Sequence, residues 1–160
     1  MIIRKTKISD VSECVKIYES AREFMRASGN PDQWPSYYPG EIDILSDIAA
    51  GSSYVCEDGG EVVAVFYFAP GPDATYNEIY EGAWKSNEPY AVIHRVAVKY
   101  HGRGIIDFIF SECFEAAGHL RIDTHRENIP MQKVLSRNGF LPCGIIYIET
   151  GAERIAFEKV

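Results

Sequence analysis

The sequence predicts a mixed α/β fold built on a sheet of about seven strands, and three observations lead to it. The chain has 160 residues, 46% hydrophobic and 24% charged, which suits one domain with a sizeable core. Apolar residues recur at three-and-four spacing in some segments and alternate or run together in others, as in helices and strands. In chain order the segments read β-α-α-β-β-β-α-β-α-β-β, without an internal repeat or a linker, so we expect residues 1–160 to form a single domain.

The first third of the chain is predicted to hold one strand and two helices. Met1–Lys5 is the first strand. Asp10 then opens an amphipathic helix, which stops before the turn residues Gly29-Asn30-Pro31. A second helix, Glu41–Ala49, ends at Gly51. The apolar face of the first helix comprises Val11, Cys14, Val15, Tyr18, Ala21 and Met25.

The middle of the chain contains a hairpin and the strand that we expect at the centre of the sheet. Ser53–Glu57 and Glu61–Phe68 flank Asp58-Gly59-Gly60, the kind of turn that joins antiparallel strands. Pro70-Gly71-Pro72 ends the hairpin, and an aromatic-rich segment follows. Tyr90–Val98 is then predicted as the central strand.

The last third supplies two helices and three strands. A helix from Gly102 to Ala117 carries a wide apolar face and is followed by the strand Leu120–Thr124. Asn128 can cap another helix, with Pro130 tolerated in its first turn. The two closing strands lie in GFLPCGIIYIE and AERIAFEK.

Charge and cysteine usage exclude several classes of function. The formal net charge is −7 and no Lys/Arg run compensates for it, which argues against general nucleic-acid binding. The four cysteines are scattered, without a C-x-x-C pair or a histidine at ligand spacing, so neither a metal site nor a disulfide framework is indicated. No apolar run approaches the roughly 20 residues that span a bilayer, and the start MIIRKTKISD lacks the features of a secretory signal. We therefore expect a cytoplasmic protein without a membrane partner.

The stretch VAVKYHGRGIIDFIF joins a strand to a helix through a Gly-X-Gly turn. Such a turn exposes unpaired backbone N–H groups at the positive end of a helix dipole, which suits a phosphate group. Gly102 and Gly104 let oxygen atoms approach the backbone. Basic side chains add charge: Lys99, His101 and Arg103. An ordinary strand-helix connection has the same pattern, so this stretch alone leaves a phosphate site and a plain turn equally open.

The whole layout resembles the GCN5-related N-acetyltransferase (GNAT) family, over nearly the full chain. In that family the central strand ends in a V-A-V-like run followed by R/Q-x-x-G-x-G/A, and IHRVAV followed by HGRGII is similar to it. The later block NIPMQKVLSRNGF resembles the family's N-x-x-A and G-F segment. Two motifs in the family's order are more specific than either one alone.

The resemblance implies a mostly antiparallel, twisted central sheet with helices on both faces. It also implies acetyl-CoA as the cofactor, no metal, and direct transfer of the acetyl group to a primary amine of a small molecule, without an acyl-enzyme. In the family, turn amides bind the pyrophosphate, and a central-strand amide, here at Val96 or nearby, donates to the thioester carbonyl. The implied cofactor-binding residues are Val96, Ala97, Val98, His101, Gly102, Arg103, Gly104, Ile105, Ile106 and Asn128.

The sequence departs from the family pattern at three positions. His101 stands where the family has Arg or Gln, and Ile106 where it prefers Gly or Ala. Leu135 replaces the tyrosine with which many members protonate the CoA thiolate. Two other functions therefore stay open beside the small-molecule N-acetyltransferase: a non-catalytic acyl-CoA-binding or sensing protein, and a protein or peptide N-acetyltransferase.

His94 is the candidate catalytic base. It lies on the central strand, where simple alternation gives it the same side as Val96 and Val98. A histidine's usual pKa of about 6.5 suits proton abstraction at neutral pH, and arylalkylamine acetyltransferases of the family carry a histidine at this offset. A half-buried structural histidine is an equal alternative. A strand bulge would change which residues face the cleft.

The acceptor pocket is expected beside the aromatic loops. Aromatic walls with a few carboxylates suit a small amine that carries apolar surface. The predicted substrate-binding residues are Trp34, Tyr76, Glu78 and Trp84. Ordinary loop packing or a homodimer contact would explain the same residues. Asp123 and His125 share one face of their strand, but we set them aside because no Ser or Cys completes a triad.

Overall fold

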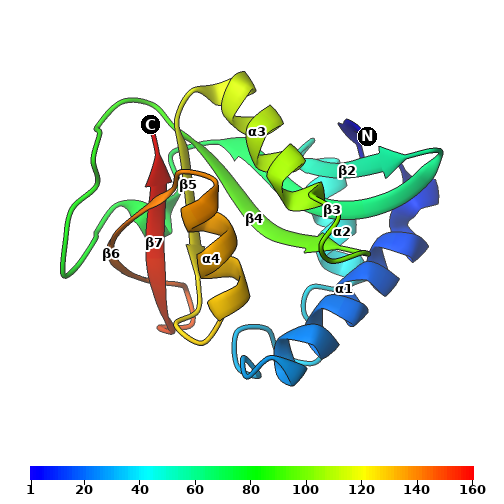
Figure 1. Ribbon diagram of the computed structural model, residues 1–160, viewed down its shortest axis with the longest axis horizontal. Coiled ribbons are helices and arrows are strands. Elements are labelled where there is room, and N and C mark those ends of the chain that lie inside the picture. The colour runs from blue at the N-terminus through cyan, green and yellow to red at the C-terminus, as the bar shows by residue number, and fades with distance from the viewer.

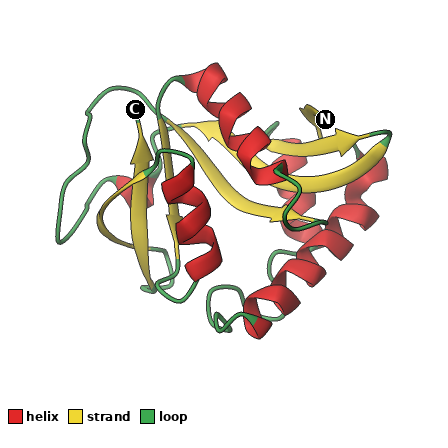
Figure 2. Ribbon diagram, viewed as in Figure 1, coloured by secondary structure: helices red, strands yellow, loops and turns green.

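The computed structural model describes residues 1–160, and its elements follow the predicted order (Figure 1). Seven strands form one sheet in the order β1-β2-β3-β4-β5-β7-β6, and helices cover both of its faces (Figure 2). The strands are β1 (Ile2–Lys5), β2 (Ser53–Asp58), β3 (Glu61–Pro70), β4 (Ala91–Val98), β5 (Leu120–Thr124), β6 (Leu141–Tyr147) and β7 (Glu153–Lys159). The helices are α1 (Val11–Ala27), α2 (Glu41–Ala49), α3 (Ile105–Ala117) and α4 (Ile129–Arg137), with short 3-10 turns η1 (Ile8–Asp10) and η2 (Ala74–Tyr76). The predicted fold class is confirmed.

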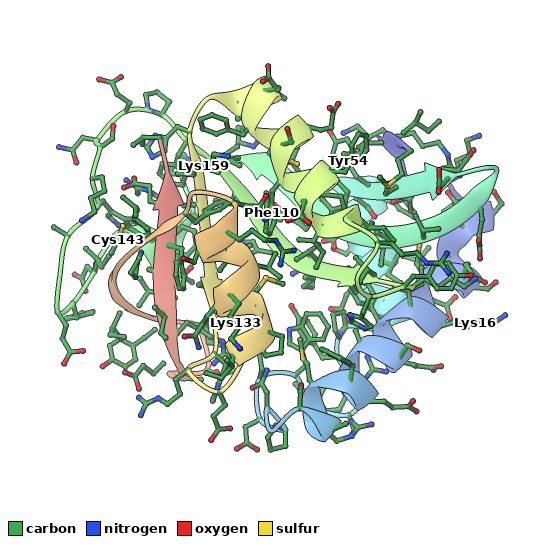
Figure 3. The ribbon with its side chains drawn as sticks, in the orientation of Figure 1. Lys16, Tyr54, Phe110, Lys133, Cys143 and Lys159 are labelled. Carbon is green, nitrogen blue, oxygen red and sulfur yellow. The ribbon has the colours of Figure 1, made fainter.

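Two helices lie on each face of the sheet. α1 and α2 pack on one face against Val55, Val65 and Ala97. α3 and α4 pack on the other face, where Phe110 of α3 (labelled in Figure 3) contacts Phe140 with ring centroids 5.1 Å apart. The apolar periodicity of each helix therefore matches the face that it buries. None of the helices combines the length and the apolar composition that crossing a bilayer requires.

The sheet is mixed because β4 and β5 run parallel, while every other neighbouring pair is antiparallel. β4 and β5 pair only at Ala91↔Leu120 and Val92↔Arg121. Beyond these residues β4 continues beside β3, and β5 continues beside β7. Figure 1 shows the result: β1–β4 fan away from β5–β7. The sheet is thus open along the carboxyl-terminal halves of its two middle strands.

The predicted helix start at Gly102 was three residues too early. Gly102 and Gly104 have φ values of 74° and 70°, in the left-handed region, so the chain makes a turn there. α3 begins only at Ile105. The turn residues His101–Gly104 are exposed and lie outside the helix.

A bulge in β4 corrects the predicted orientation of His94. Tyr67 pairs with His94 and Val65 pairs with Ala97, so three steps along β4 face two steps along β3. Arg95 accommodates the extra residue with a φ of 50°. Val96 then packs on the α3 face, whereas His94 shares the opposite face with Ala97. The prediction that His94 and Val96 share one side was wrong, and the bulge is the reason.

A buried ionic cluster fastens the long β3–β4 connection to β7. The Glu158 side chain is 1% exposed. Its carboxylate accepts hydrogen bonds from Arg121 Nε (3.1 Å) and the Lys85 amide, and lies 2.7 Å from His119 Nε2. The Arg121 guanidinium also lies over the Trp84 ring, 4.0 Å from its centroid. The aromatic-rich segment is therefore held against the sheet through one carboxylate.

We expect Glu158→Gln to lower the free energy of unfolding by about 3 kcal/mol at neutral pH, because it leaves Arg121 buried without a charged partner. Burial favours the neutral carboxyl, but the hydrogen bonds from His119, the Lys85 amide and Arg121 outweigh it and hold the pKa of Glu158 below its ordinary value. The carboxylate therefore stabilises the fold above the unfolded-state pKa of about 4.3, and this contribution is lost as the pH falls through the lower folded-state pKa.

Urea unfolding at neutral and acidic pH measures the difference, which should shrink in acid. Glu115→Gln, on an exposed position of α3, is the matched control. A Glu158 variant as stable as this control at neutral pH would contradict the role given to the cluster.

Candidate active site

A cavity of about 630 Å³ occupies the opening between β4 and β5. The two strands form its walls. The α1–α2 loop (residues 28–40), the β6–β7 loop (residues 148–152) and the start of α4 complete it. Gln33 holds the α1–α2 loop in place: its Oε1 accepts hydrogen bonds from Asn30 and Asn128, and its carbonyl oxygen accepts one from Arg154. The loop is thus tied across the cavity to both α4 and β7.

The opening lets side chains line the cavity from both faces of the sheet. Ile122 and Thr124 pair with residues of β7 that face α3 and α4, and Val96 faces the same way; we call this the helix-3 side. Asp123 pairs with Ala156 on the opposite face. His94 lies on that face too, together with the α1–α2 loop, and we call it the helix-1 side. Groups bound on the two sides can therefore meet through the gap in the sheet.

His94 is held between two carboxylates on the helix-1 side. Its Nε2 lies 2.8 Å from Asp73 Oδ2, and its Nδ1 lies 3.9 Å from Asp123 Oδ2. The hydrogen bond from His94, together with those from Thr75, lowers the pKa of Asp73 to about 2. Asp73 is therefore ionised at neutral pH and accepts a proton-bearing Nε2. In the neutral ring this leaves the lone pair on Nδ1.

Asp123 is fixed by a buried tyrosine. Tyr76 is 1% exposed and donates a hydrogen bond of 2.7 Å to Asp123 Oδ2. Burial, followed by the nearby charge of Asp123, raises the pKa of Tyr76 well above its ordinary value. Tyr76 is therefore a neutral donor that orients the carboxylate.

Of the four predicted substrate-binding residues, Trp34 lines the cavity and three do not. Tyr76 is buried behind Asp123. Trp84 donates to the Tyr76 carbonyl oxygen and packs on Arg121. Glu78 accepts a hydrogen bond from Tyr80 at a separate surface site. Both aromatic side chains are used in packing the β3–β4 connection against the sheet, and Glu78 lies on its outer surface.

The turn before α3 has the backbone that a phosphate site needs. None of the N–H groups from His101 to Asp107 donates a hydrogen bond within the protein. A Cβ on Gly102 would meet no atom within 4 Å, so its left-handed φ, rather than steric contact, requires glycine.

The basic side chains around this turn differ in whether they are paired with a carboxylate. Lys99 is paired with Glu13 and Glu61. Arg103 lies over the Tyr100 ring without an ion pair, and His101 stacks on Phe24 with centroids 4.0 Å apart. Unlike Lys99, these two side chains form no ion pair with a carboxylate.

The helix-3 side offers unsatisfied polar groups along the gap. The Lys99 amide donates to Val63 of β3, so by alternation the amides of Val98 and Val96 point away from β3, toward the opening. Thr124 Oγ1 is fully buried without a hydrogen-bond partner. Asn128 is engaged: its Oδ1 caps α4 at Met131 and its Nδ2 donates to Gln33. These free amides and the orphaned hydroxyl fit an extended ligand with amide groups, such as the pantetheine arm of CoA.

Known structures share this architecture. An acetyltransferase of the GNAT family from Streptococcus agalactiae 2603 has a TM-score of 0.90 and 28% sequence identity, over 99% of this chain and 94% of that chain. The chain is therefore similar to an acetyltransferase of the GNAT family over nearly its full length. The resemblance seen in the two sequence motifs is thereby confirmed.

More distant GNAT-like structures share the fold. A GNAT-family acetyltransferase from Listeria monocytogenes 4b F2365 has a TM-score of 0.72 at 16% identity, over 99% of this chain and 93% of that chain. The ribosomal-protein-alanine N-acetyltransferase from Brucella melitensis has a TM-score of 0.65 at 19% identity, over 100% and 99% of the two chains. No family model and no curated protein matches the sequence.

Several residues that line or border the cavity were not predicted from the sequence. Asp73 follows the Pro-Gly-Pro turn and caps η2, a pattern that indicates only a turn. Asp123 was set aside because no Ser or Cys completes a triad with it. A histidine that acts as a general base needs no such nucleophile, only a carboxylate that orients it. Arg95 looks like one more strand residue, but the bulge turns it toward Asp47 (2.7 Å) and Tyr38 (3.0 Å). Nothing in the sequence around Arg154 distinguishes it from an ordinary residue of the closing strand.

Gly104→Ala tests whether the turn before α3 binds the phosphates of CoA. We expect it to weaken CoA binding by roughly 10- to 100-fold, because a distorted turn loses charge-assisted hydrogen bonds from its amides. Gly118→Ala is the matched control: this glycine ends the same helix with the same φ of 70° and has equally open surroundings. Both variants should lose similar stability, about 1 kcal/mol. Equal CoA affinities of the two variants by calorimetry would show that the phosphate assignment is wrong.

Proposed function

We propose that this GNAT protein transfers an acetyl group from acetyl-CoA to the primary amine of a small molecule. The observation that carries the proposal is the His94 ring, which lines the cavity with its Nε2 anchored to Asp73 and its Nδ1 3.9 Å from Asp123. This is the arrangement of an oriented general base. The similarity to the Streptococcus agalactiae acetyltransferase supports the reaction class.

The residues that would hold acetyl-CoA lie on the helix-3 side. The amides from His101 to Asp107 would bind the phosphates at the start of α3. Thr124 and the open edge of β4 would bind the pantetheine arm, and the Val96 amide would donate to the carbonyl oxygen on which negative charge develops. The bound cofactor supplies the activated acetyl thioester.

His94 removes the proton from the amine on the opposite side of the gap. It accepts this proton on Nδ1 as the N–C bond forms and the C–S bond breaks, and Asp73 and Asp123 then stabilise the charged ring. Starting from an ammonium ion, two protons leave the nitrogen: one ends on the thiolate and one goes to solvent. No Ser or Cys lines the cavity, which supports direct transfer without an acyl-enzyme.

The tied α1–α2 loop favours a small acceptor over a protein. Gln33 joins this loop to α4 and β7 across the cavity, which leaves little room for a polypeptide segment. The Brucella protein named for acting on a ribosomal protein shares the fold at 19% identity, and that name alone does not extend to this chain.

Leu135 favours a second candidate, a protein that binds acyl-CoA without turnover. The side chain is fully buried among core residues of the α3 face, so nothing at this position can protonate the leaving thiolate. In the first proposal, solvent or the charged His94 ring supplies that proton.

Release of CoA thiol from acetyl-CoA, measured with a panel of primary amines, separates the two functions. We expect thiol release that depends on the amine and a matching acetylated product by mass spectrometry. Acetyl-CoA binding in calorimetry, with no amine-dependent thiol release across the panel, would support the sensing protein instead.

A further inference from the structure

Arg154 is a buried cation on the helix-1 side of the cavity that has no hydrogen-bonded carboxylate. It is 6% exposed and lines the cavity. Its Nη1 and Nη2 donate to the carbonyl oxygens of Glu153 and Gln33 at 2.9 and 3.0 Å. Its nearest carboxylate oxygen, Asp123 Oδ1, is 4.0 Å from Nε. A guanidinium has five N–H donors, so Arg154 keeps donors free for a bound anion.

Because Arg154 is buried, leaving its charge without a hydrogen-bonded carboxylate is energetically unfavourable. Desolvation lowers the pKa of its guanidinium from the ordinary value, and the charge of Asp123 only partly offsets it. A carboxylate that accepted two parallel hydrogen bonds would neutralise the charge in the geometry that guanidinium groups favour. The free donors therefore fit a ligand carboxylate.

A second unsatisfied arrangement lies between Asp123 and His94, where two hydrogen-bond acceptors are close together. With Nε2 bonded to Asp73, the Nδ1 lone pair of His94 and Asp123 Oδ2 face each other across 3.9 Å. Both groups are hydrogen-bond acceptors, so the space between them needs a donor with at least two N–H or O–H groups. A primary ammonium group meets this need and places its proton on the path to His94.

We propose that the acceptor is an amino acid, with its amine between His94 and Asp123 and its carboxylate on Arg154. This inference rests on the proposed acetyltransferase function. Asp123 links the two subsites, because Nδ1 of His94 approaches its Oδ2 and Nε of Arg154 approaches its Oδ1. In an α-amino acid the amine nitrogen and the carboxylate carbon are both bonded to Cα, so the two groups are close enough to reach both subsites.

The walls of the cavity indicate the side chain of this amino acid. Trp34, Tyr38 and Tyr67 line it on the helix-1 side, and aromatic rings suit an apolar or aromatic side chain. The Tyr38 hydroxyl and the Tyr67 ring are engaged by Arg95, so they present a fixed surface. We expect leucine, methionine and phenylalanine to be better acceptors than aspartate or glutamate.

Matched pairs of acceptors test the inference on the unaltered protein. Phenylalanine and phenethylamine differ only in the carboxylate, as do leucine and isopentylamine. We expect kcat/KM for the amino acid to exceed that for its partner by at least roughly tenfold, the usual weight of a charge-assisted hydrogen bond. Turnover of the amines without a preference for the amino acids would overturn the inference and leave the acetyltransferase function standing. Failure to acetylate either member of any pair would overturn both.

The Arg154→Gln variant then tests whether Arg154 is responsible for the preference for amino acids over amines. We expect KM for phenylalanine to rise roughly 10- to 100-fold, while KM for phenethylamine and the acetyl-CoA affinity change little. Arg126→Gln is the matched control, because Arg126 is 63% exposed and pairs with Glu153 outside the cavity. Equal losses for both acceptors would indicate a structural role of Arg154 and overturn its assignment. A preference for the amine in the wild type would indicate that the acidic residues of the cavity select a cation instead.

Discussion

Replacing His94 by glutamine is expected to lower kcat/KM by roughly 10²–10⁴-fold, the usual contribution of a general base. Glutamine keeps a polar side chain of similar size on the helix-1 side but cannot accept a proton from an amine. The loss should appear with every acceptor that the wild type uses, because it concerns the proton and not the acceptor's side chain. Steady-state kinetics with acetyl-CoA and a good acceptor measure it.

The His94→Gln variant should lose catalytic rate without losing acetyl-CoA binding. Acetyl-CoA affinity by calorimetry should stay unchanged, since the cofactor is proposed to lie on the helix-3 side, away from His94. The acidic limb of the kcat/KM profile should flatten, provided that an acceptor of low pKa is used so that amine ionisation does not mimic the limb. His125→Gln changes the same residue type outside the cavity lining and is the control. Near-normal turnover of His94→Gln would make His94 a structural strand residue.

Asp73→Asn is expected to lower kcat by roughly 10²-fold or more. An asparagine can turn its amide N–H₂ toward Nε2, which would move the ring proton to Nδ1 and remove the lone pair that is proposed to accept the amine proton. The contacts to Thr75 need only an acceptor oxygen and can survive. The variant should therefore fold and bind acetyl-CoA but react slowly, and Asp73→Glu should recover part of the rate.

The low pKa of Asp73 determines the pH range in which its contact with His94 stabilises the fold. Its folded-state value of about 2 lies below the ordinary value of about 3.9. Its stabilising contribution is thus complete above that ordinary value and is lost only as the pH falls toward the folded one. Asp32→Asn is the control, because Asp32 lines the same cavity without a contact to His94. A rate loss no larger than that of Asp32→Asn would remove Asp73 from the mechanism.

Local patterns in the sequence were sufficient for the elements and for the turn that joins β4 to α3. Periodicity, capping residues and Gly-X-Gly are all read over a few neighbouring residues, and they predicted the strand, turn and helix from Val96 to Phe110. The helix start was misplaced only because two left-handed glycines delay it to Ile105. The resemblance to the GNAT family followed from two such local motifs in the right order.

The acceptor side was largely missed because it depends on contacts between distant segments. Asp73, His94 and Asp123 come from three different segments, and only the pairing of β4 with β3 and the packing of the β3–β4 connection bring them together. The bulge at Arg95 depends on the register with β3 and has no sequence signal of its own. Trp84 and Tyr76 were chosen for their residue type, which does not distinguish a pocket wall from a packed loop.

The extra residue in β4 also separates two kinds of evolutionary change. It acts as a phase shift: before Arg95 the helix-1 side takes Val92 and His94, and after Arg95 it takes Ala97, while Ile93 and Val96 both face α3. A substitution on the face of β4 that carries His94 leaves unchanged the core beneath α3, where Val96 and Val98 are buried. A lineage can therefore change the proposed acceptor side through residues on one face of β4 while the proposed cofactor side, on the other face, is inherited unchanged.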